Sequence, residues 1–145
     1  MNQKNRLFWL VSIASLAFAL GSTAIISSFI KERIAIFGSF VGLQPSFNQG
    51  IAFGVNLGLL QPILIGIALL FVLWIALRHD SSALEKIGFG LIIGGGVANI
   101  VDRLQDGFVT DIFQVGCFPI FNVADSFITI GVGLLLINML KRCNF

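Results

Sequence analysis

Residues Leu7 to Ile30 read LFWLVSIASLAFALGSTAIISSFI, a run of 24 residues without a charged side chain. A helix needs about 20 apolar residues to cross the hydrocarbon core of a bilayer. The run ends at Lys31, Glu32 and Arg33, which are charged and belong at the membrane surface. This stretch therefore predicts a membrane-spanning helix and places the chain among membrane proteins.

Three further apolar stretches follow it. The uncharged stretch from residue 34 to residue 77 is too long for one helix, and polar residues interrupt its first half. Because a span needs about 20 apolar residues, only the second half of this stretch is assigned to a helix. We expect the remaining spans at about Asn56 to Leu77, at Ile87 to about Leu104, and at about Phe118 to Leu140.

The composition agrees with four spans. Of the 145 residues, 57% are hydrophobic and 11% are charged, and the mean hydropathy is +0.97. Soluble proteins carry about 25% charged residues. The composition excludes an ordinary soluble enzyme, a disordered chain and a nucleic-acid-binding protein, and the net charge of +2 is too small to indicate a polyanionic partner.

The basic residues predict the orientation of the spans. Six of the nine Lys and Arg residues lie in the N-terminal segment, in the turn from Arg78 to Lys86, and after the fourth span. Such residues mark the cytoplasmic side, so we expect both termini there. The outward segments are then about Lys31 to Val55 and about Gln105 to Cys117. Apolar residues between Ile34 and Val41 favour short strands in the first of them.

The predicted fold class is thus an all-α membrane protein with four transmembrane helices and a small extracytoplasmic β-rich cradle. Residues 1–145 are expected to form a single integral membrane domain.

Asp125 is the only charged residue in the predicted fourth span. A carboxylate at the centre of a span costs about 2.5–3.5 kcal/mol on insertion scales, and such residues usually face a bundle interior or a wet cavity. Two interpretations are open. Asp125 is a functional acid, or it interacts with the helix dipole in the first turns of the helix, where Asn122 could also serve as the cap.

Asp111 lies 14 residues before Asp125, in the second outward segment, among apolar neighbours. Two carboxylates about 4 Å apart at an effective dielectric near 20 repel by about 4 kcal/mol, or about three pKa units. One proton is then shared between them at neutral pH. Such a pair can activate water with one member and protonate a carbonyl and a leaving amine with the other.

No metal or cofactor is expected. The sequence contains no HExxH motif and no cluster of metal-ligand residues, and His79 is its only histidine. His79 falls in the predicted cytoplasmic turn, so a Ser-His-Asp triad at the outer face is excluded.

Polar residues also occur at the outer end of the third span. Asn99, Asp102 and Arg103 are spaced at i, i+3 and i+4, which places them on one helical face. Arg103 could pair with Asp102 or a lipid headgroup, or Asn99 and Arg103 could hold a substrate backbone. The run Gly94–Gly96 could pack helices closely or form a substrate groove.

Four short motifs resemble those of the lipoprotein signal peptidases (signal peptidase II), and they occur in that family's order. The motifs are Asn48-Gln49-Gly50-Ile51-Ala52-Phe53, the stretch from Gly95 to Leu104, Gly107-Phe108-Val109-Thr110-Asp111-Ile112, and Phe118-Pro119-Ile120-Phe121-Asn122-Val123-Ala124-Asp125.

The resemblance implies an aspartyl endopeptidase of the bacterial inner membrane with its active site toward the extracytoplasmic face. It would remove the signal peptide of a prolipoprotein by cutting before a cysteine that carries a diacylglyceryl group. Globomycin-type peptides would inhibit it, and residues 34 to 55 would form a β-cradle on the membrane surface. Because one chain holds both acids, we expect a monomer in contact with membrane lipid. The implied catalytic pair is Asp111 and Asp125, and the implied substrate-binding residues are Asn48, Gly50, Asn99, Arg103 and Asn122.

One departure from the family keeps alternatives open. Many members carry an acidic residue near the outer end of the first span, whereas Gly21 to Ile25 contains none. A catalytically divergent paralogue is therefore one alternative. A small four-span proton-coupled transporter is another, since intramembrane acids also mark ion pathways, although the chain shows no internal repeat of the kind many transporters have.

Overall fold

The computed structural model describes residues 5–50, 58 and 60–143. Within these ranges, four helices are long and apolar enough to cross a membrane, as predicted. The chain is therefore a multi-pass membrane protein. The helices are α1 (Arg6–Phe29), α2 (Leu60–Arg78), α3 (Ala83–Asp106) and α4 (Val123–Cys143), and the strands are β1 (Ile34–Phe37), β2 (Val41–Asn48) and β3 (Val109–Val115).

The third helix begins four residues before the predicted start at Ile87, because its N-terminus is capped. Ser82 Oγ accepts a hydrogen bond from the Glu85 backbone N–H at 3.2 Å, and Glu85 Oε2 accepts one from the Ser82 N–H at 2.7 Å. This reciprocal capping box satisfies two N–H groups that a helix start would otherwise leave unpaired. The polar turn predicted at Arg78 to Lys86 is correspondingly shorter. The predicted start of the second span, Asn56, lies outside the described residues.

The fourth helix begins at Val123 and not at Phe118 as predicted. The preceding residues pair with the sheet. Phe121 accepts hydrogen bonds from the N–H groups of Ile112 and Phe113 at 3.0 and 2.8 Å, and it donates to the Phe113 carbonyl at 3.2 Å. The start of α4 is therefore fixed beside β3.

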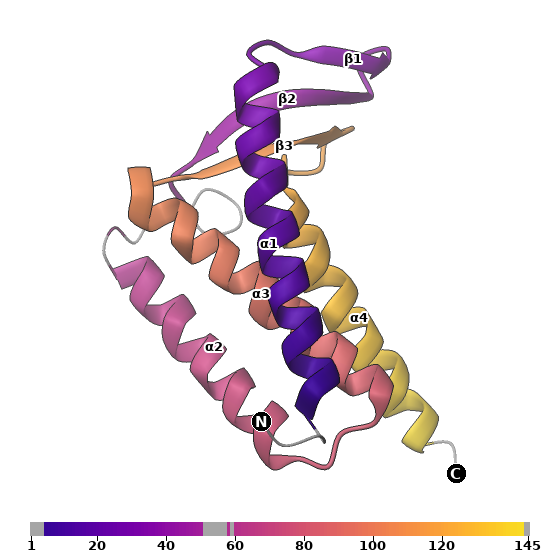
Figure 1. The fold of residues 1–145 in the computed structure, drawn as a ribbon. Helices are drawn as coiled ribbons and strands as arrows, with labels where there is room; N and C mark the ends of the chain where they lie inside the picture. Colours follow the sequence, from indigo (N-terminus) through magenta and orange to yellow (C-terminus); the bar gives the residue numbers. More distant parts are fainter. Residues whose placement is uncertain (1–4, 51–57, 59, 144–145) are drawn as a thin grey trace.

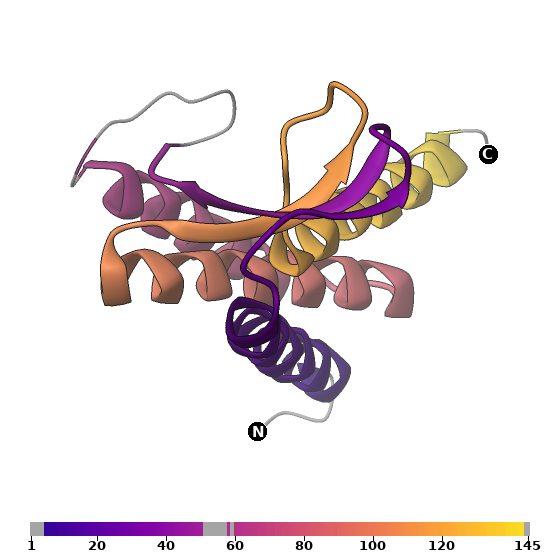
Figure 2. The same cartoon turned by 90° about the horizontal axis from the view of Figure 1, so that it is seen from above.

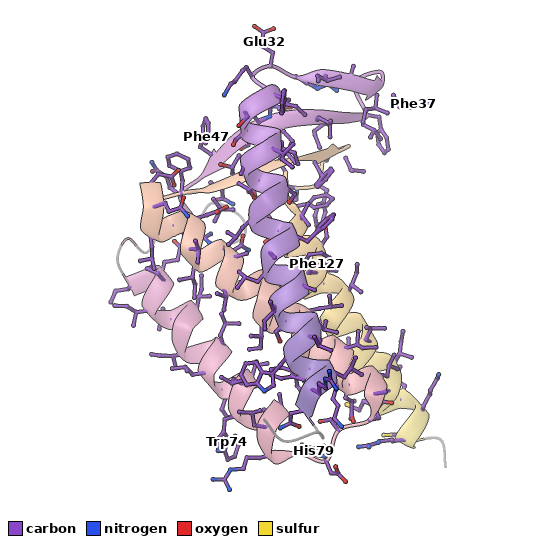
Figure 3. The ribbon with its side chains drawn as sticks, viewed as in Figure 1. Glu32, Phe37, Phe47, Trp74, His79 and Phe127 are labelled. Atoms are coloured by element: carbon purple, nitrogen blue, oxygen red, sulfur yellow. The ribbon has the colours of Figure 1, made fainter. Side chains whose placement is uncertain are left out.

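The sheet lies at one end of the helices, and both ends of the chain lie at the other (Figure 1). Its strand order is β1-β2-β3, and both pairs are antiparallel. Seen from above, it crosses the ends of the helices (Figure 2). Trp74 and His79 lie at the end away from the sheet, whereas Glu32, Phe37 and Phe47 lie at the sheet end (Figure 3). His79 is thus remote from the sheet, as the sequence predicted.

The composition of the sheet corrects one expectation. The strands predicted after Ile34 are confirmed, but the cradle is not confined to residues 34 to 55. The segment expected to be the second outward loop contributes β3, which pairs with β2 through Ser46↔Asp111 and Asn48↔Val109. Asp111 therefore lies on a strand and not on a loop. Its partners are more than 60 residues away in the sequence, so local patterning could not reveal the pairing.

Helix α3 lies at the centre of the bundle and uses the run Gly94–Gly96 to approach three neighbours. A Cβ on the first glycine would collide with Ser15 of α1. A Cβ on the second would lie 2.5 Å from the carbonyl oxygen of Ala124 in α4, and one on the third would lie 2.5 Å from the Leu69 side chain of α2. Small residues let membrane helices pack this closely, so the packing interpretation of the glycine run is confirmed.

Candidate active site

The register between β2 and β3 brings Asn48 beside Asp111. Asn48 Nδ2 donates to Asp111 Oδ2 at 3.0 Å. The other carboxyl oxygen, Oδ1, accepts from Asn122 Nδ2 at 2.9 Å. Asp111 is only 2% exposed. Its carboxyl group is thus buried but hydrogen-bonded on both oxygens, as a buried polar group requires.

The N-terminus of α4 places Asn122 and Asp125 face to face. Asn122 Oδ1 accepts from the Asp125 backbone N–H at 2.8 Å, and Asp125 Oδ2 accepts from the Asn122 N–H at 3.3 Å. This is the geometry of a helix cap. The capping interpretation of the two residues is therefore correct. It leaves Asp125 Oδ1 available for a further contact, so capping and a functional role are compatible.

Asn99 of α3 completes a connection between the two acids. Its Nδ2 donates to Asp125 Oδ1 at 2.8 Å, and its Oδ1 accepts from Asn122 Nδ2 at 3.0 Å. The acids are therefore linked as Asp111–Asn122–Asn99–Asp125. In the described part of the chain no hydrogen bond joins the two carboxyl groups directly. The sequence predicted two carboxyl groups about 4 Å apart that share a proton, whereas in the structure the amides of Asn122 and Asn99 connect them.

Arg103 connects this network to the end of β2. Its Nη2 donates to the Gly50 carbonyl at 2.9 Å, and its Nη1 donates to the Asn99 carbonyl at 3.1 Å. The Gly50 N–H in turn donates to Asn48 Oδ1 at 2.9 Å. Among the described residues, no ion pair joins Arg103 to Asp102, and the buried Arg103 Nε has no hydrogen-bond partner. Arg103 therefore acts on backbone carbonyls rather than on its neighbouring acid.

The buried environment of Asp111 raises the pKa of its carboxyl group. The pKa of Asp111 rises from an ordinary value of 3.8 to about 6, chiefly because the carboxyl group is buried. The negative charge of Asp125 raises this pKa further, whereas the hydrogen bonds from Asn48 and Asn122 and the positive charge of Arg103 lower it. The sequence predicted repulsion between the two acids as the cause of a raised pKa. Burial of Asp111 is the larger cause, and repulsion from Asp125 adds to it.

A cavity of about 1230 Å³ opens beside this network. Five of the seven predicted site residues line it: Asn48, Gly50, Asn99, Arg103 and Asp125. Asp111 and Asn122 do not line the cavity, and both are buried, with Asp111 hydrogen-bonded to the amide of Asn48. The structure thus brings all seven together but exposes only one of the two acids to the cavity.

The remaining wall of this main cavity is mostly apolar and comes from the sheet, from the segment before α4 and from three helices. It includes Ile65 of α2, Gly96 of α3 and Ile128 of α4. Gly96 therefore contributes to a groove as well as to helix packing. Ser126, which was not predicted from the sequence, also lines the cavity. The signal that could have indicated it is a small polar residue directly after the intramembrane acid.

A protein-family model matches most of the chain. Residues 9–141 match the family model described as signal peptidase (SPase) II. The chain belongs to the signal peptidase II family. The match includes both acids, all three asparagines of the network and Arg103.

Individual signal peptidase II relatives support the assignment. The chain is 35% identical to a lipoprotein signal peptidase of Streptococcus pneumoniae, over 85% of this chain and 88% of that protein. It is 33% identical to a lipoprotein signal peptidase of Nostoc punctiforme, over 98% and 94% of the two chains. The similarity covers nearly the full length of each.

Two solved structures share the fold. Both are described as bacterial membrane enzymes. The first has a TM-score of 0.82 and 26% identity, covering 92% of this chain and 87% of that one. The second has a TM-score of 0.79 and 28% identity, covering 91% of each chain. The arrangement of four spans and a small sheet is therefore that of a bacterial membrane enzyme, and the transporter alternative is not favoured.

Proposed function

We propose that this chain is a membrane aspartyl endopeptidase that removes signal peptides from prolipoproteins, with Asp111 and Asp125 as its catalytic pair. The observation that carries the proposal is the amide-linked pair of acids beside a large apolar cavity, in a chain of the signal peptidase II family. A lipid-modified peptide suits this cavity, because most of its wall is apolar and its polar groups gather near the two acids.

The proposed reaction is direct attack of water on a peptide carbonyl. Asp125, which reaches the cavity, takes a proton from the water as the oxygen bonds to the carbonyl carbon. Asp111, whose raised pKa favours the protonated form below about pH 6, supplies a proton to the carbonyl oxygen. Asp125 then passes the proton it took from water to the leaving nitrogen, Asp111 takes a proton back from a hydroxyl of the tetrahedral intermediate, and the C–N bond breaks to give an acid and an amine. Because the Asn48 amide covers Asp111, substrate entry has to displace that amide.

The substrate-binding role is assigned to Asn48, Gly50, Asn99, Arg103 and Asn122. The first four line the cavity, whereas Asn122 would act through its hydrogen bonds to Asn99 and Asp111. In the proposed complex the scissile bond precedes a cysteine that carries a diacylglyceryl group, and globomycin-type peptides compete for the same cavity. One chain supplies every residue of the site, which supports a monomeric enzyme.

A cleavage assay tests the function. Purified chain in detergent would be incubated with a diacylglyceryl-modified prolipoprotein, and the shift to the mature size would be followed on a gel with and without globomycin. We expect cleavage that the inhibitor abolishes. An intact fold without cleavage, beside an active control enzyme, would favour the divergent paralogue, and an acid restored between Gly21 and Ile25 would then be tested.

Substitution of Arg103 tests substrate binding. Arg103 holds the carbonyls of Asn99 and Gly50, two residues of the cavity wall. Hydrogen bonds from charged groups are worth about 1.5–3 kcal/mol, so loss of the guanidinium is expected to disturb this wall and to raise KM about tenfold or more, with a smaller change in kcat. Arg103→Ala removes the group, and Arg103→Lys keeps the charge but cannot span two carbonyls. We expect both to raise KM. An unchanged KM in Arg103→Ala would contradict the assignment.

Orientation in the bacterial inner membrane is proposed from the distribution of basic residues, with both termini cytoplasmic and the active site extracytoplasmic. The two exposed cysteines provide a matched test, because Cys117 follows β3 and Cys143 ends α4. In Cys143→Ser, an impermeant maleimide should label Cys117 in intact spheroplasts. In Cys117→Ser, Cys143 should react only after permeabilisation. The reverse pattern would overturn the orientation.

A further inference from the structure

A second, smaller cavity lies between the sheet and the start of α4. Its volume is about 230 Å³, and its wall includes Ile36 of β1, Leu43 of β2 and Val115 of β3. We propose that it is a subsite for one acyl chain of the substrate's diacylglyceryl group. This inference rests on the function proposed above and extends it from the peptide to the lipid.

The second cavity lies directly beside the main cavity. Phe121 and Ser126 line both this cavity and the main one, so the two cavities share a wall. These two residues directly adjoin Asn122 and Asp125 in the sequence. The lipid of the substrate begins on the cysteine next to the scissile bond. One of its two acyl chains therefore starts close to the shared wall whenever the scissile bond lies at the acids.

The wall of the second cavity is mostly apolar. Its polar side chains already have partners. Gln114 Nε2 donates to the carbonyls of Ser39 and Gly116 at 3.2 and 3.3 Å, and its Oε1 accepts from Arg33 Nη2 at 3.1 Å. Ser126 Oγ donates to the Asn122 carbonyl at 3.0 Å. A polar peptide segment would find no free side-chain partner here, whereas an alkyl chain needs none.

The second cavity is large enough for part of an alkyl chain, and its edge is exposed. An apolar cavity of about 150 Å³ can hold a benzene molecule, so about 230 Å³ accommodates a segment of alkyl chain. Two residues of its wall, Ile36 and Val115, are 63% and 38% exposed. A chain longer than the cavity can therefore extend past them out of the cavity.

The test is to fill the cavity and vary the length of the acyl chains. Leu43→Trp adds bulk to a residue that lines this cavity and not the main one. Phe37→Trp is the matched control, since Phe37 lies on the same sheet, is 75% exposed and lines neither cavity (Figure 3). Cleavage kinetics would be measured with a substrate carrying two 16-carbon chains and with one carrying two 4-carbon chains.

We expect Leu43→Trp to raise KM for the long-chain substrate about tenfold, the loss that follows when about two methylene groups no longer fit. KM for the short-chain substrate, and both values for Phe37→Trp, should stay as in the wild type. An equal rise for both substrates, or no rise for either, would overturn the subsite. If Leu43→Trp does not fold, Val41→Phe fills the same cavity and gives the same test.

The same assay separates this inference from the proposed function. Wild-type cleavage that Asp125→Asn abolishes reports the peptidase, whatever the acyl chains do. The subsite is tested only by whether Leu43→Trp raises KM for the long-chain substrate more than for the short-chain substrate. A wild-type chain that cleaves neither substrate would refute both, whereas cleavage without that difference in KM would refute the subsite alone.

Discussion

Replacing either Asp111 or Asp125 by asparagine is expected to lower kcat by about 10²- to 10⁴-fold, the usual contribution of a general acid or base. The change keeps the shape of the side chain but removes its negative charge, its ability to exchange a proton and one of its two acceptor atoms. Both variants should still fold, because an amide oxygen can accept hydrogen bonds that the carboxylate now accepts from Asn99 and Asn122. Kinetics of prolipoprotein cleavage, together with thermal unfolding in detergent, would measure this.

Asp106→Asn is the matched control. Asp106 ends α3 near the same end of the molecule, and its side chain is exposed. The change in net charge is the same, but we expect wild-type kcat. Wild-type turnover in either Asp111→Asn or Asp125→Asn would contradict the assignment of the pair, and a loss of turnover in all three would indicate a general electrostatic effect.

Replacing Asn122 by leucine is expected to give the second largest loss. Its Nδ2 contacts both Asp111 and Asn99, and its Oδ1 caps α4. Each buried group left unpaired costs about 1–3 kcal/mol, which corresponds to roughly 10- to 100-fold in rate if the loss falls on the transition state. We therefore expect Asn122→Leu to cleave about 100-fold more slowly. Single-turnover kinetics would measure the loss.

Asn122→Ser separates the two roles of this residue. Serine is about as good an N-cap as asparagine, so the variant should unfold near the wild-type temperature and yet remain slow. The pH profile gives a readout that a merely structural role would not change. Without the Asn122 donor the carboxylate of Asp111 is less stable, its pKa rises above about 6, and the fall in activity at high pH should move to higher pH. If Asn122→Ser cleaves at the wild-type rate with an unchanged pH profile, Asn122 acts only as a helix cap.

Three of the seven candidate site residues stand out locally in the sequence. Asp125 is a charge in an apolar span, and Asn99 and Arg103 end another span on one face. The motifs shared with the family then joined them to Asn48, Gly50, Asp111 and Asn122. All seven do lie together in the structure. What the motifs could not indicate is the amide between the acids, or that Asp111 is buried while Asp125 faces the cavity.

The sequence by itself determined that the chain crosses a membrane four times, because each span is a single continuous segment whose apolar length can be counted. Local signals also indicated strands between Ile34 and Val41, where β1 and the first residue of β2 lie. The tertiary structure decided the third strand, the amide-linked acids and the two cavities. The hydrogen bonds that build the site join residues 23, 26 and 63 positions apart. Such contacts depend on how the spans pack, and that packing depends on where the glycines of α3 let the other three helices approach.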